Sequence, residues 1–260
     1  MGDKLDYMRY AGKVNRAAIE WGFHTAKPGV TLVDVDKAIE WYIRNAGCKP
    51  AFKGYQPTGF PSPFPACACI SLNDVVVHGI PNHYVLKPSD LLTIDVGTEY
   101  EGWFVDAART RIIAGTNELG TRLIDATEDI MNAQLAVIKH DCDMLTLVEA
   151  AGRIARKHKV NILSEWGGHG ISNKIHTEPF IPNALTEGKG HLFRAFEEQN
   201  LAKVKFVAGE TYCIEPVTTF GSTDTFTDED GWTIRKRDGQ LAAHTERCLL
   251  VTKEGYELLS

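Results

Sequence analysis

The feature of this sequence that most constrains its fold is a pattern that occurs twice. Residues 78–82 read His-Gly-Ile-Pro-Asn, and residues 169–173 read His-Gly-Ile-Ser-Asn. Residues 90–95 and 210–215 correspond in the same way, because each segment begins and ends with an acid. Internal self-similarity of this kind indicates related structural units that bury a shared core. We therefore predict two similar halves packed about a pseudo-twofold axis.

Local periodicity places helices before strands in both halves. Helices are predicted over about 5–24, 31–47, 121–140 and 146–158, and strand-like runs occupy 91–96, 103–113, 211–219 and 245–252. Thr31 and Thr146 each precede an acid by three positions, the spacing of a capping box. Turn-forming residues at 97–102 predict an antiparallel hairpin. This order predicts one α+β domain over 1–260, with halves of roughly 1–118 and 119–260 and an antiparallel sheet covered by helices.

Four acids stand where strands are expected to be buried. Asp95 follows Leu-Leu-Thr-Ile, Asp106 follows Trp-Phe-Val, Glu215 follows Tyr-Cys-Ile, and Glu246 precedes Arg-Cys-Leu-Leu-Val. For any one of them, an acid at a strand end or in a salt bridge is the simpler interpretation. If the halves meet as predicted, all four converge and repel one another unless cations neutralise them. Together with His169 in a Gly-Gly-His-Gly segment, they predict a metal site.

The donor set indicates which metals and which chemistry to expect. A donor set of carboxylates with one imidazole suits Mn²⁺, Fe²⁺, Co²⁺ or Zn²⁺, and it differs from the thiolate donors of a structural zinc site. Bridging carboxylates would hold two ions about 3.5–4 Å apart, and a water between them would lose a proton near neutral pH. The sequence therefore predicts a hydrolase. His78 and His176 lie in turns from which a side chain can reach a cleft, although a lone histidine in a loop is more often on the surface.

Five motifs in order carry a resemblance to a known family. They are Val77 to Pro81, Ile94 to Gly97 with Asp106, Gly168 to Ile171 with His176 to Pro179, Ile214 to Pro216, and Trp232 through Glu246. In order and spacing, over nearly the whole chain, this set resembles type I methionine aminopeptidases. The resemblance implies a pita-bread fold and release of the initiator methionine from proteins whose second residue is small.

The resemblance also implies a role for each matched residue. Asp95 would bind one metal, Asp106 and Glu246 would bridge two, and His169 and Glu215 would complete the shell of the other. Glu215 would also accept the proton of the attacking water. His176 would hydrogen-bond the scissile carbonyl and its oxyanion, and His78 would contact the substrate amide nitrogen. A free α-amine on the substrate would bind a metal, which restricts cleavage to the N-terminal residue.

Methionine selectivity in the family comes from an apolar, aromatic pocket. The matching positions are Tyr55, Phe60, Cys69, Ile175 and Trp232, and a thioether packs well among such groups. Ordinary core or loop packing is the alternative for each of them. The prolines and aromatic residues of 52–65 predict an ordered loop that is neither helix nor strand. The chain departs from the family pattern in a longer loop at 55–69 and an insertion at 185–205. It also has Ile175 in place of an aromatic residue before His176, and an uncommon sequence around Glu246.

Two other functions remain open on the same fold. A proline-cleaving aminopeptidase or prolidase would share the five ligands, but such relatives usually carry an extra N-terminal domain, whereas this chain begins at the first helix of the fold. A non-catalytic binding homologue would typically have lost ligands, and here all five and both accessory histidines are present. A nucleotide site at 167–170 is disfavoured because no Walker lysine or G-x-G-x-x-G segment occurs there.

Bulk properties indicate the partners and the compartment. A formal charge of −6 with mixed signs argues against nucleic acid as a principal partner. No apolar stretch approaches the roughly 20 residues of a membrane span, and no export signal is evident. The six cysteines include no C-x-x-C pair, which favours free thiols in a reducing compartment. We expect a cytoplasmic monomer that acts on the N-termini of nascent polypeptides, and any docking on the ribosome surface would use the folded domain.

Overall fold

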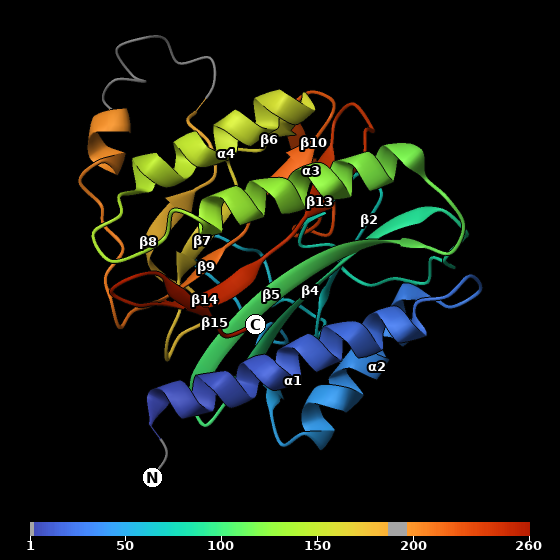
Figure 1. Ribbon diagram of the computed structural model, residues 1–260. Helices are drawn as coiled ribbons and strands as arrows, with labels where there is room; N and C mark the ends of the chain where they lie inside the picture. The colour runs from blue at the N-terminus through green and yellow to red at the C-terminus, as the bar shows by residue number, and fades with distance from the viewer. Residues whose placement is uncertain (1–2, 187–196) are drawn as a thin grey trace.

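One long antiparallel hairpin crosses the middle of the molecule. A computed structural model describes residues 3–186 and 197–260. Strands β4 (Asp90–Tyr100) and β5 (Trp103–Ile113) pair along their whole length. Helices α1 (Lys4–Thr25) and α2 (Leu32–Asn45) lie on one side of the molecule, and α3 (Glu118–Leu135) and α4 (Met144–His158) lie on the other (Figure 1). The predicted helices and the α+β class are confirmed.

The hairpin turns more tightly than the sequence suggested. The predicted turn at 97–102 is wrong, because β4 continues to Tyr100 and only Glu101 and Gly102 form the turn. Both residues have positive φ, 51° and 82°, as a two-residue type I′ turn requires. Gly97 serves packing instead, since a Cβ there would lie 2.7 Å from a ring carbon of Phe52. The longer ladder brings Gly97 opposite Asp106.

The helix caps follow side-chain chemistry, with one departure from expectation. The Thr31 hydroxyl accepts a hydrogen bond from the Asp34 amide at 3.2 Å, so the predicted cap of α2 is confirmed. At α4 the predicted cap, Thr146, is wrong. Asp143 caps this helix by accepting from the backbone N–H and the hydroxyl of Thr146, each at 2.8 Å. A carboxylate accepts more strongly than a hydroxyl does, so the helix begins three residues earlier.

One predicted strand of the second half is divided between two sheets, and another begins later than expected. The run 211–219 splits into β9 (Thr211–Ile214) and β10 (Val217–Thr219), and Pro216 in the break has no N–H for a ladder. The run 245–252 starts as a strand only at Arg247, because Thr245 and Glu246 connect β13 (Ala242–His244) to β14 (Arg247–Val251). Glu215 and Glu246 therefore stand where the chain passes from one sheet to another.

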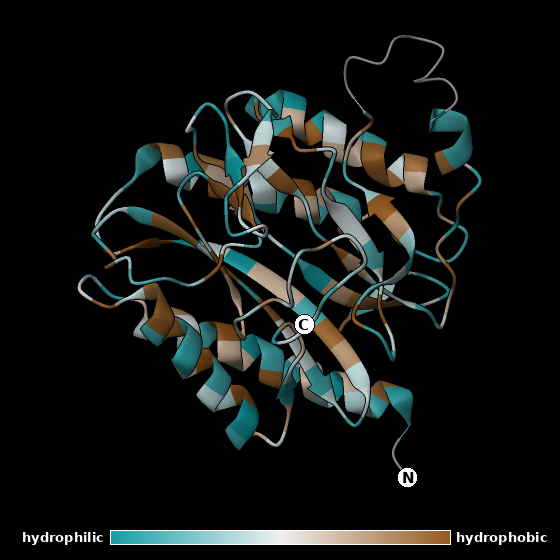
Figure 2. Ribbon diagram, turned by 180° about the vertical axis from the view of Figure 1, so that it is seen from behind, coloured by the Kyte–Doolittle hydropathy of each residue, from teal (hydrophilic) through white to brown (hydrophobic). Residues whose placement is uncertain are grey.

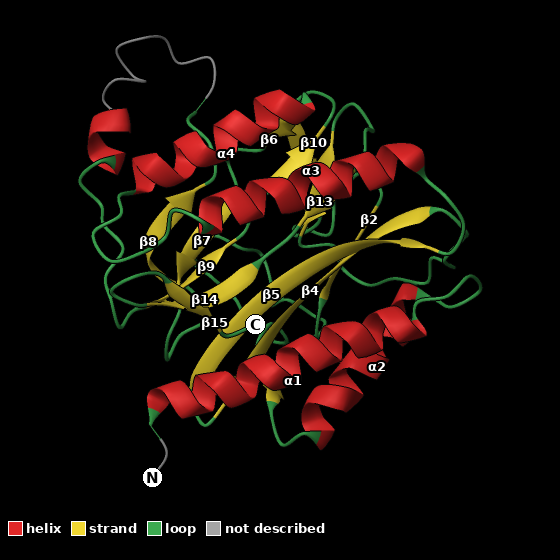
Figure 3. Ribbon diagram, in the orientation of Figure 1, coloured by secondary structure: helices red, strands yellow, loops and turns green. Residues whose placement is uncertain are grey.

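The remaining strands complete four small sheets, and every pair of strands among the described residues is antiparallel. They are β1 (Lys49–Pro50), β2 (Cys69–Leu72), β3 (Val75–Val77), β6 (Asn161–Ile162), β7 (Gly167–Gly170), β8 (Thr177–Pro182), β11 (Thr225–Thr227), β12 (Ile234–Lys236) and β15 (Tyr256–Leu258). Figure 3 shows β2, β7 and β15 between the two pairs of helices. Residues 52–65 form neither helix nor strand, as predicted. The predicted insertion at 185–205 falls partly outside the described residues.

Side chains of β4 point alternately into the apolar core and toward the face that carries the predicted metal ligands. Leu92, Ile94 and Val96 are buried in the apolar cluster that includes residues of α1 and α2. Because successive side chains of a strand point to opposite faces, Asp95 and Gly97 face the other half of the molecule. Apolar and polar residues alternate along the helices (Figure 2), and the buried residues of α2 and α4 recur at the spacing of an amphipathic helix. The apolar face of the hairpin thus anchors the first half, and its other face is free to carry acids.

A buried carboxyl holds the segment that leads into β2. Asp36 on α2 accepts hydrogen bonds from the backbone N–H groups of Cys67 at 3.0 Å and Ala68 at 2.8 Å. Burial nevertheless raises the pKa of Asp36 from 3.8 to about 6. The folded state therefore binds the Asp36 proton more tightly than the unfolded chain does. The stability contributed by this proton is complete below pH 4 and is lost as the pH rises through 6.

We expect Asp36→Asn to remove this pH dependence, since the amide oxygen can still accept both hydrogen bonds. Between pH 4 and pH 7.5, wild-type protein should lose about 2.5 kcal/mol of unfolding free energy relative to the variant. Urea titrations at both pH values measure the difference, with Asp125→Asn at an exposed position of α3 as the control. Parallel pH curves for wild type and Asp36→Asn would show that the Asp36 carboxyl titrates normally.

Candidate metal centre and active site

The central hairpin supplies two of the predicted ligands. Asp95 pairs with Ala108, and Asp106 pairs with Gly97. Asp95 and Asp106 are therefore diagonal neighbours on one face of the ladder. The Phe52 ring packs against Gly97, the residue opposite Asp106. On the other side of β4, Cys69 pairs with Asp95, so its side chain lies on the same face.

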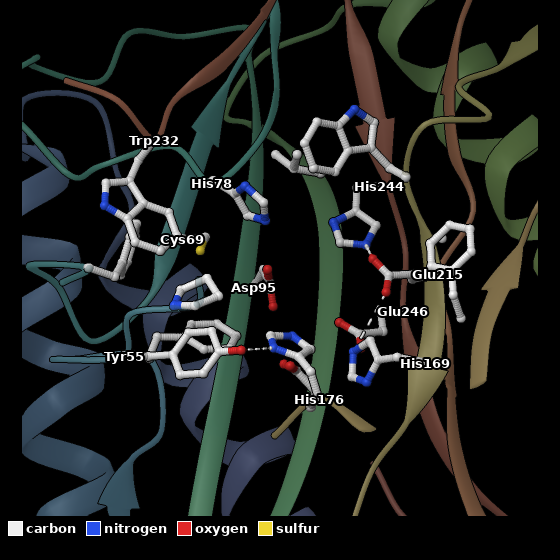
Figure 4. Close-up of a pocket in the computed structure, with 18 of the residues that line it drawn as sticks. Tyr55, Cys69, His78, Asp95, His169, His176, Glu215, Trp232, His244 and Glu246 are labelled. Atoms are coloured by element: carbon white, nitrogen blue, oxygen red, sulfur yellow. Dashed lines mark hydrogen bonds and ion pairs between the residues drawn. The ribbon is translucent and has the colours of Figure 1, made fainter. Parts of the chain in front are cut away.

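The second half supplies the other three ligands by the same rule. His169 on β7 lies opposite Cys213 on β9, and Cys213 lies opposite Cys248 on β14. Glu215 is two residues after Cys213 and Glu246 is two residues before Cys248, so both carboxylates continue this face. His169 Nε2 is 3.7 Å from Glu215 Oε1 and 3.9 Å from Glu246 Oε1 (Figure 4).

Glu246 joins the two groups of ligands. Its backbone N–H donates to the Ala108 carbonyl at 3.0 Å, and the Arg109 guanidinium donates to its carbonyl. Oxygen atoms of Asp95, Asp106 and Glu246 all lie within 4.8 Å of one another. The structure thus brings together all five of the residues that the sequence predicted as ligands.

The electrostatics of this cluster fit divalent cations. Three buried oxygens, Asp95 Oδ1, Asp106 Oδ1 and Glu246 Oε1, have no hydrogen-bond partner among the described residues. Burial raises the pKa of Asp106 to about 7. Burial, with the charge of Asp106 as the next cause, raises the pKa values of Asp95, Glu215 and Glu246 well above their usual range. Ligand atoms about 2.1 Å from one ion lie about 3–4 Å apart, which matches the spacing around His169.

Two further histidines flank the carboxylates. His176 Nδ1 lies 2.8 Å from the Tyr55 hydroxyl, and its ring meets the His169 ring edge-on at 4.4 Å between centroids. His78, whose φ of 56° is left-handed, packs edge-on against Trp166 at 5.2 Å. Burial lowers the pKa of His78 to about 4, so its imidazole is neutral at pH 7. Both accessory histidines predicted from the sequence therefore lie at the cluster.

A cavity of about 630 Å³ is lined by the carboxylates and His169 on one side and by aromatic side chains on the other. Its lining includes four of the five residues predicted for a methionine pocket, namely Tyr55, Phe60, Cys69 and Trp232. The rings of Phe60 and Trp232 lie 4.1 Å apart between centroids. Ile175 is not part of the lining and instead lies in the buried cluster behind it, with Cys69 and Trp232.

The structure adds lining residues that sequence reasoning missed. Phe64 and Trp166 join the aromatic wall, and His244 lies beside Glu215 (Figure 4). His244 could have been found, because it stands two positions before Glu246 and a period of two favours the same face. Phe64 and Trp166 carry no such signal, since neither belongs to a periodic element.

The whole chain has a counterpart among known proteins. Residues 6–253 match the model of metallopeptidase family M24. This chain belongs to that family. Methionine aminopeptidase 1 of Mycobacterium tuberculosis is 34% identical over 99% of this chain and 92% of its own length. Methionine aminopeptidase of Aquifex aeolicus is 31% identical, over 99% and 96% of the two chains.

Solved structures of M24 proteins agree with the predicted fold. Methionine aminopeptidase of Thermotoga maritima superposes with a TM-score of 0.87 at 30% identity, over 100% of this chain and 97% of that chain. Prolidase of Pyrococcus furiosus gives a TM-score of 0.70 at 16% identity and shares only the fold, over 100% of this chain and 64% of that chain. The predicted pita-bread fold, the family resemblance and the class of metal-dependent aminopeptidase are confirmed. Within 3–186 and 197–260, no helix is long and apolar enough to cross a membrane.

Proposed function

We propose that this protein removes the N-terminal methionine from proteins and peptides whose second residue is small. The observation that carries the proposal is the position of an aromatic cavity directly beside the five convergent ligands. An unbranched thioether fits such a wall, and a cluster of carboxylates attracts the α-ammonium group of an N-terminus. The relatives at 30–34% identity, named methionine aminopeptidases, favour this substrate over X-Pro peptides.

We further propose that Asp95, Asp106, His169, Glu215 and Glu246 hold two divalent ions, with Mn²⁺, Fe²⁺, Co²⁺ and Zn²⁺ as the candidates. Two ions would neutralise four buried carboxylates, and the oxygen-rich donor set with one imidazole suits these metals. Bound ions would supply an acidified water and polarise the scissile carbonyl.

The side chains around the ligands have distinct roles in the proposed reaction. Glu215 accepts the proton of the attacking water and later returns it to the leaving amine. The Tyr55 hydroxyl donates to His176 Nδ1, which leaves the proton of His176 on Nε2, and this N–H donates to the developing oxyanion. His78 is a neutral imidazole that contacts the amide nitrogen of the substrate, and its Nδ1 has no partner among the described residues.

The proposed cellular setting follows from the substrate. Nascent polypeptides carry the initiator methionine, so we propose that the protein acts on their N-termini in the cytoplasm, as a monomer.

Release of free methionine from Met-Gly-Met tests the proposal. We expect chelation to abolish release and readdition of one of the four metals to restore it, while an X-Pro peptide remains uncut. Metal-restored cleavage of the X-Pro peptide would instead favour a prolidase. Failure of every metal to restore cleavage of either peptide would favour a non-catalytic binding protein.

A further inference from the structure

His244 is a buried imidazole in the cavity to which the proposed function gives no role. It lies on β13 opposite Val217 and is 2% exposed. Its side chain lines the cavity, and its Nε2 atom has no hydrogen-bond partner among the described residues. A buried polar atom without a partner is costly, so its presence at this position requires an explanation.

The backbone of His244 is fixed from both sides. Its N–H donates to Thr110 Oγ1 at 3.1 Å, and the Thr110 hydroxyl donates to its carbonyl at 2.6 Å. Thr110 belongs to β5, the strand that carries Asp106. The point at which the imidazole is attached is therefore held in place beside the strand that carries Asp106.

The two oxygens of Glu215 face two different imidazoles. Glu215 Oε1 lies 3.7 Å from His169 Nε2, and Oε2 lies 3.5 Å from His244 Nε2. In Figure 4, the His244 ring points at the Glu215 carboxylate from the side away from His169. We propose that His244 is a positioning residue for Glu215, in which Nε2–H donates to Oε2 and leaves Oε1 directed at the metals.

This role is compatible with the proposed function of Glu215, on which it rests. A distance of 3.5 Å is at the limit of a hydrogen bond, and hydrogen bonds of active sites commonly shorten when substrate binds. A carboxylate oxygen has two lone pairs, so Oε2 can hold this hydrogen bond and still accept a proton. Partners behind a metal ligand orient the ligand and restrict how many of its oxygens bind the metal.

The geometry favours a hydrogen-bond donor over a sixth metal ligand. Among the described residues, His169 Nε2 lies within 4.0 Å of two carboxylates, those of Glu215 and Glu246. His244 Nε2 lies within 4.0 Å of one carboxylate, that of Glu215. It approaches a single ligand, Glu215, and therefore has the contacts of an orienting partner.

His244→Leu and His244→Gln separate the roles, because leucine fills the space without a donor and glutamine restores an N–H at similar reach. We expect His244→Leu to lower kcat for Met-Gly-Met about 10- to 100-fold with little change in KM, and His244→Gln to recover most of it. The visible absorption of the Co²⁺-loaded protein should change in His244→Leu, as Glu215 changes its binding mode, and return in His244→Gln. Calorimetry should count the same number of ions in all three proteins.

The control is His158→Leu, which removes a partly buried histidine paired with Asp129 outside the cavity. It should leave kcat and the Co²⁺ spectrum unchanged. If His244→Leu kept the kcat and the Co²⁺ spectrum of the wild type, His244 would only fill space and the proposed positioning role would be excluded. Loss of one ion in both His244 variants would make it a ligand and overturn the proposal. If wild-type protein released no methionine, the proposed function would fail, whereas the Co²⁺ spectra would still decide the role of His244.

Discussion

Glu215→Gln is expected to lower kcat for methionine release by about 10³- to 10⁴-fold while the fold is retained. Glutamine has nearly the same shape, but it cannot accept a proton, and its amide is a weaker metal ligand. The backbone should stay in place, because the Glu215 carbonyl accepts from Asn183 Nδ2 at 2.9 Å whatever the side chain is. The measurement is the initial rate at saturating metal, with urea unfolding to show that the protein is folded.

Glu210→Gln is the matched control for this variant. Glu210 is an exposed acid at the start of the segment that ends at Glu215, and it should tolerate the change. Calorimetry separates the two proposed roles of Glu215, since retention of the bound metal with loss of rate identifies the proton acceptor. Activity at the wild-type level would exclude Glu215 from the mechanism.

His176→Ala is expected to lower kcat by about 10²- to 10³-fold, because one donor to the developing oxyanion is lost. Metal affinity and KM should change little, since the proposed contact strengthens only in the transition state. Steady-state kinetics and Mn²⁺ calorimetry measure these quantities.

His83→Ala provides the comparison, because His83 is exposed and does not line the cavity. The ligand atoms of Asp106, His169 and His176 lie within 4.8 Å of one another, so a metal role for His176 is a real alternative. A loss of metal affinity as large as the loss of rate would establish that role.

The elements that the sequence predicted well are those governed by local rules. Helices α1 and α2 follow from apolar spacing, and Thr31 caps α2 as its spacing indicates. The cap of α4 was missed because Asp143 and Thr146 both satisfy the local pattern, and only their relative strength as acceptors decides between them. The turn of the hairpin was misplaced because Gly97 is a packing glycine, which nothing near it in the sequence reveals.

The ligands were predictable because each is an acid beside an apolar run, and burial of four such acids has few explanations. The residues that form the aromatic wall of the cavity were less predictable from the sequence. Its loop residues are placed by distant contacts, such as the hydrogen bond from Trp232 Nε1 to the Ser62 carbonyl at 3.1 Å. The spacing of apolar residues along the sequence does not reveal contacts between distant segments. For this reason Phe64 was missed and Ile175 was expected in the lining.

The positions of Glu215 and Glu246, where the chain passes from one sheet to another, have a consequence for the stability of the protein. Each carboxylate stands at a junction between sheets, so ions bound there would tie several sheets together. Ligand that binds only the folded state adds about 2.7 kcal/mol of stability when its free concentration is a hundred times Kd. The supply of metal in the cell would therefore set the lifetime of this protein against proteases, and its abundance would fall together with its activity when metal is scarce.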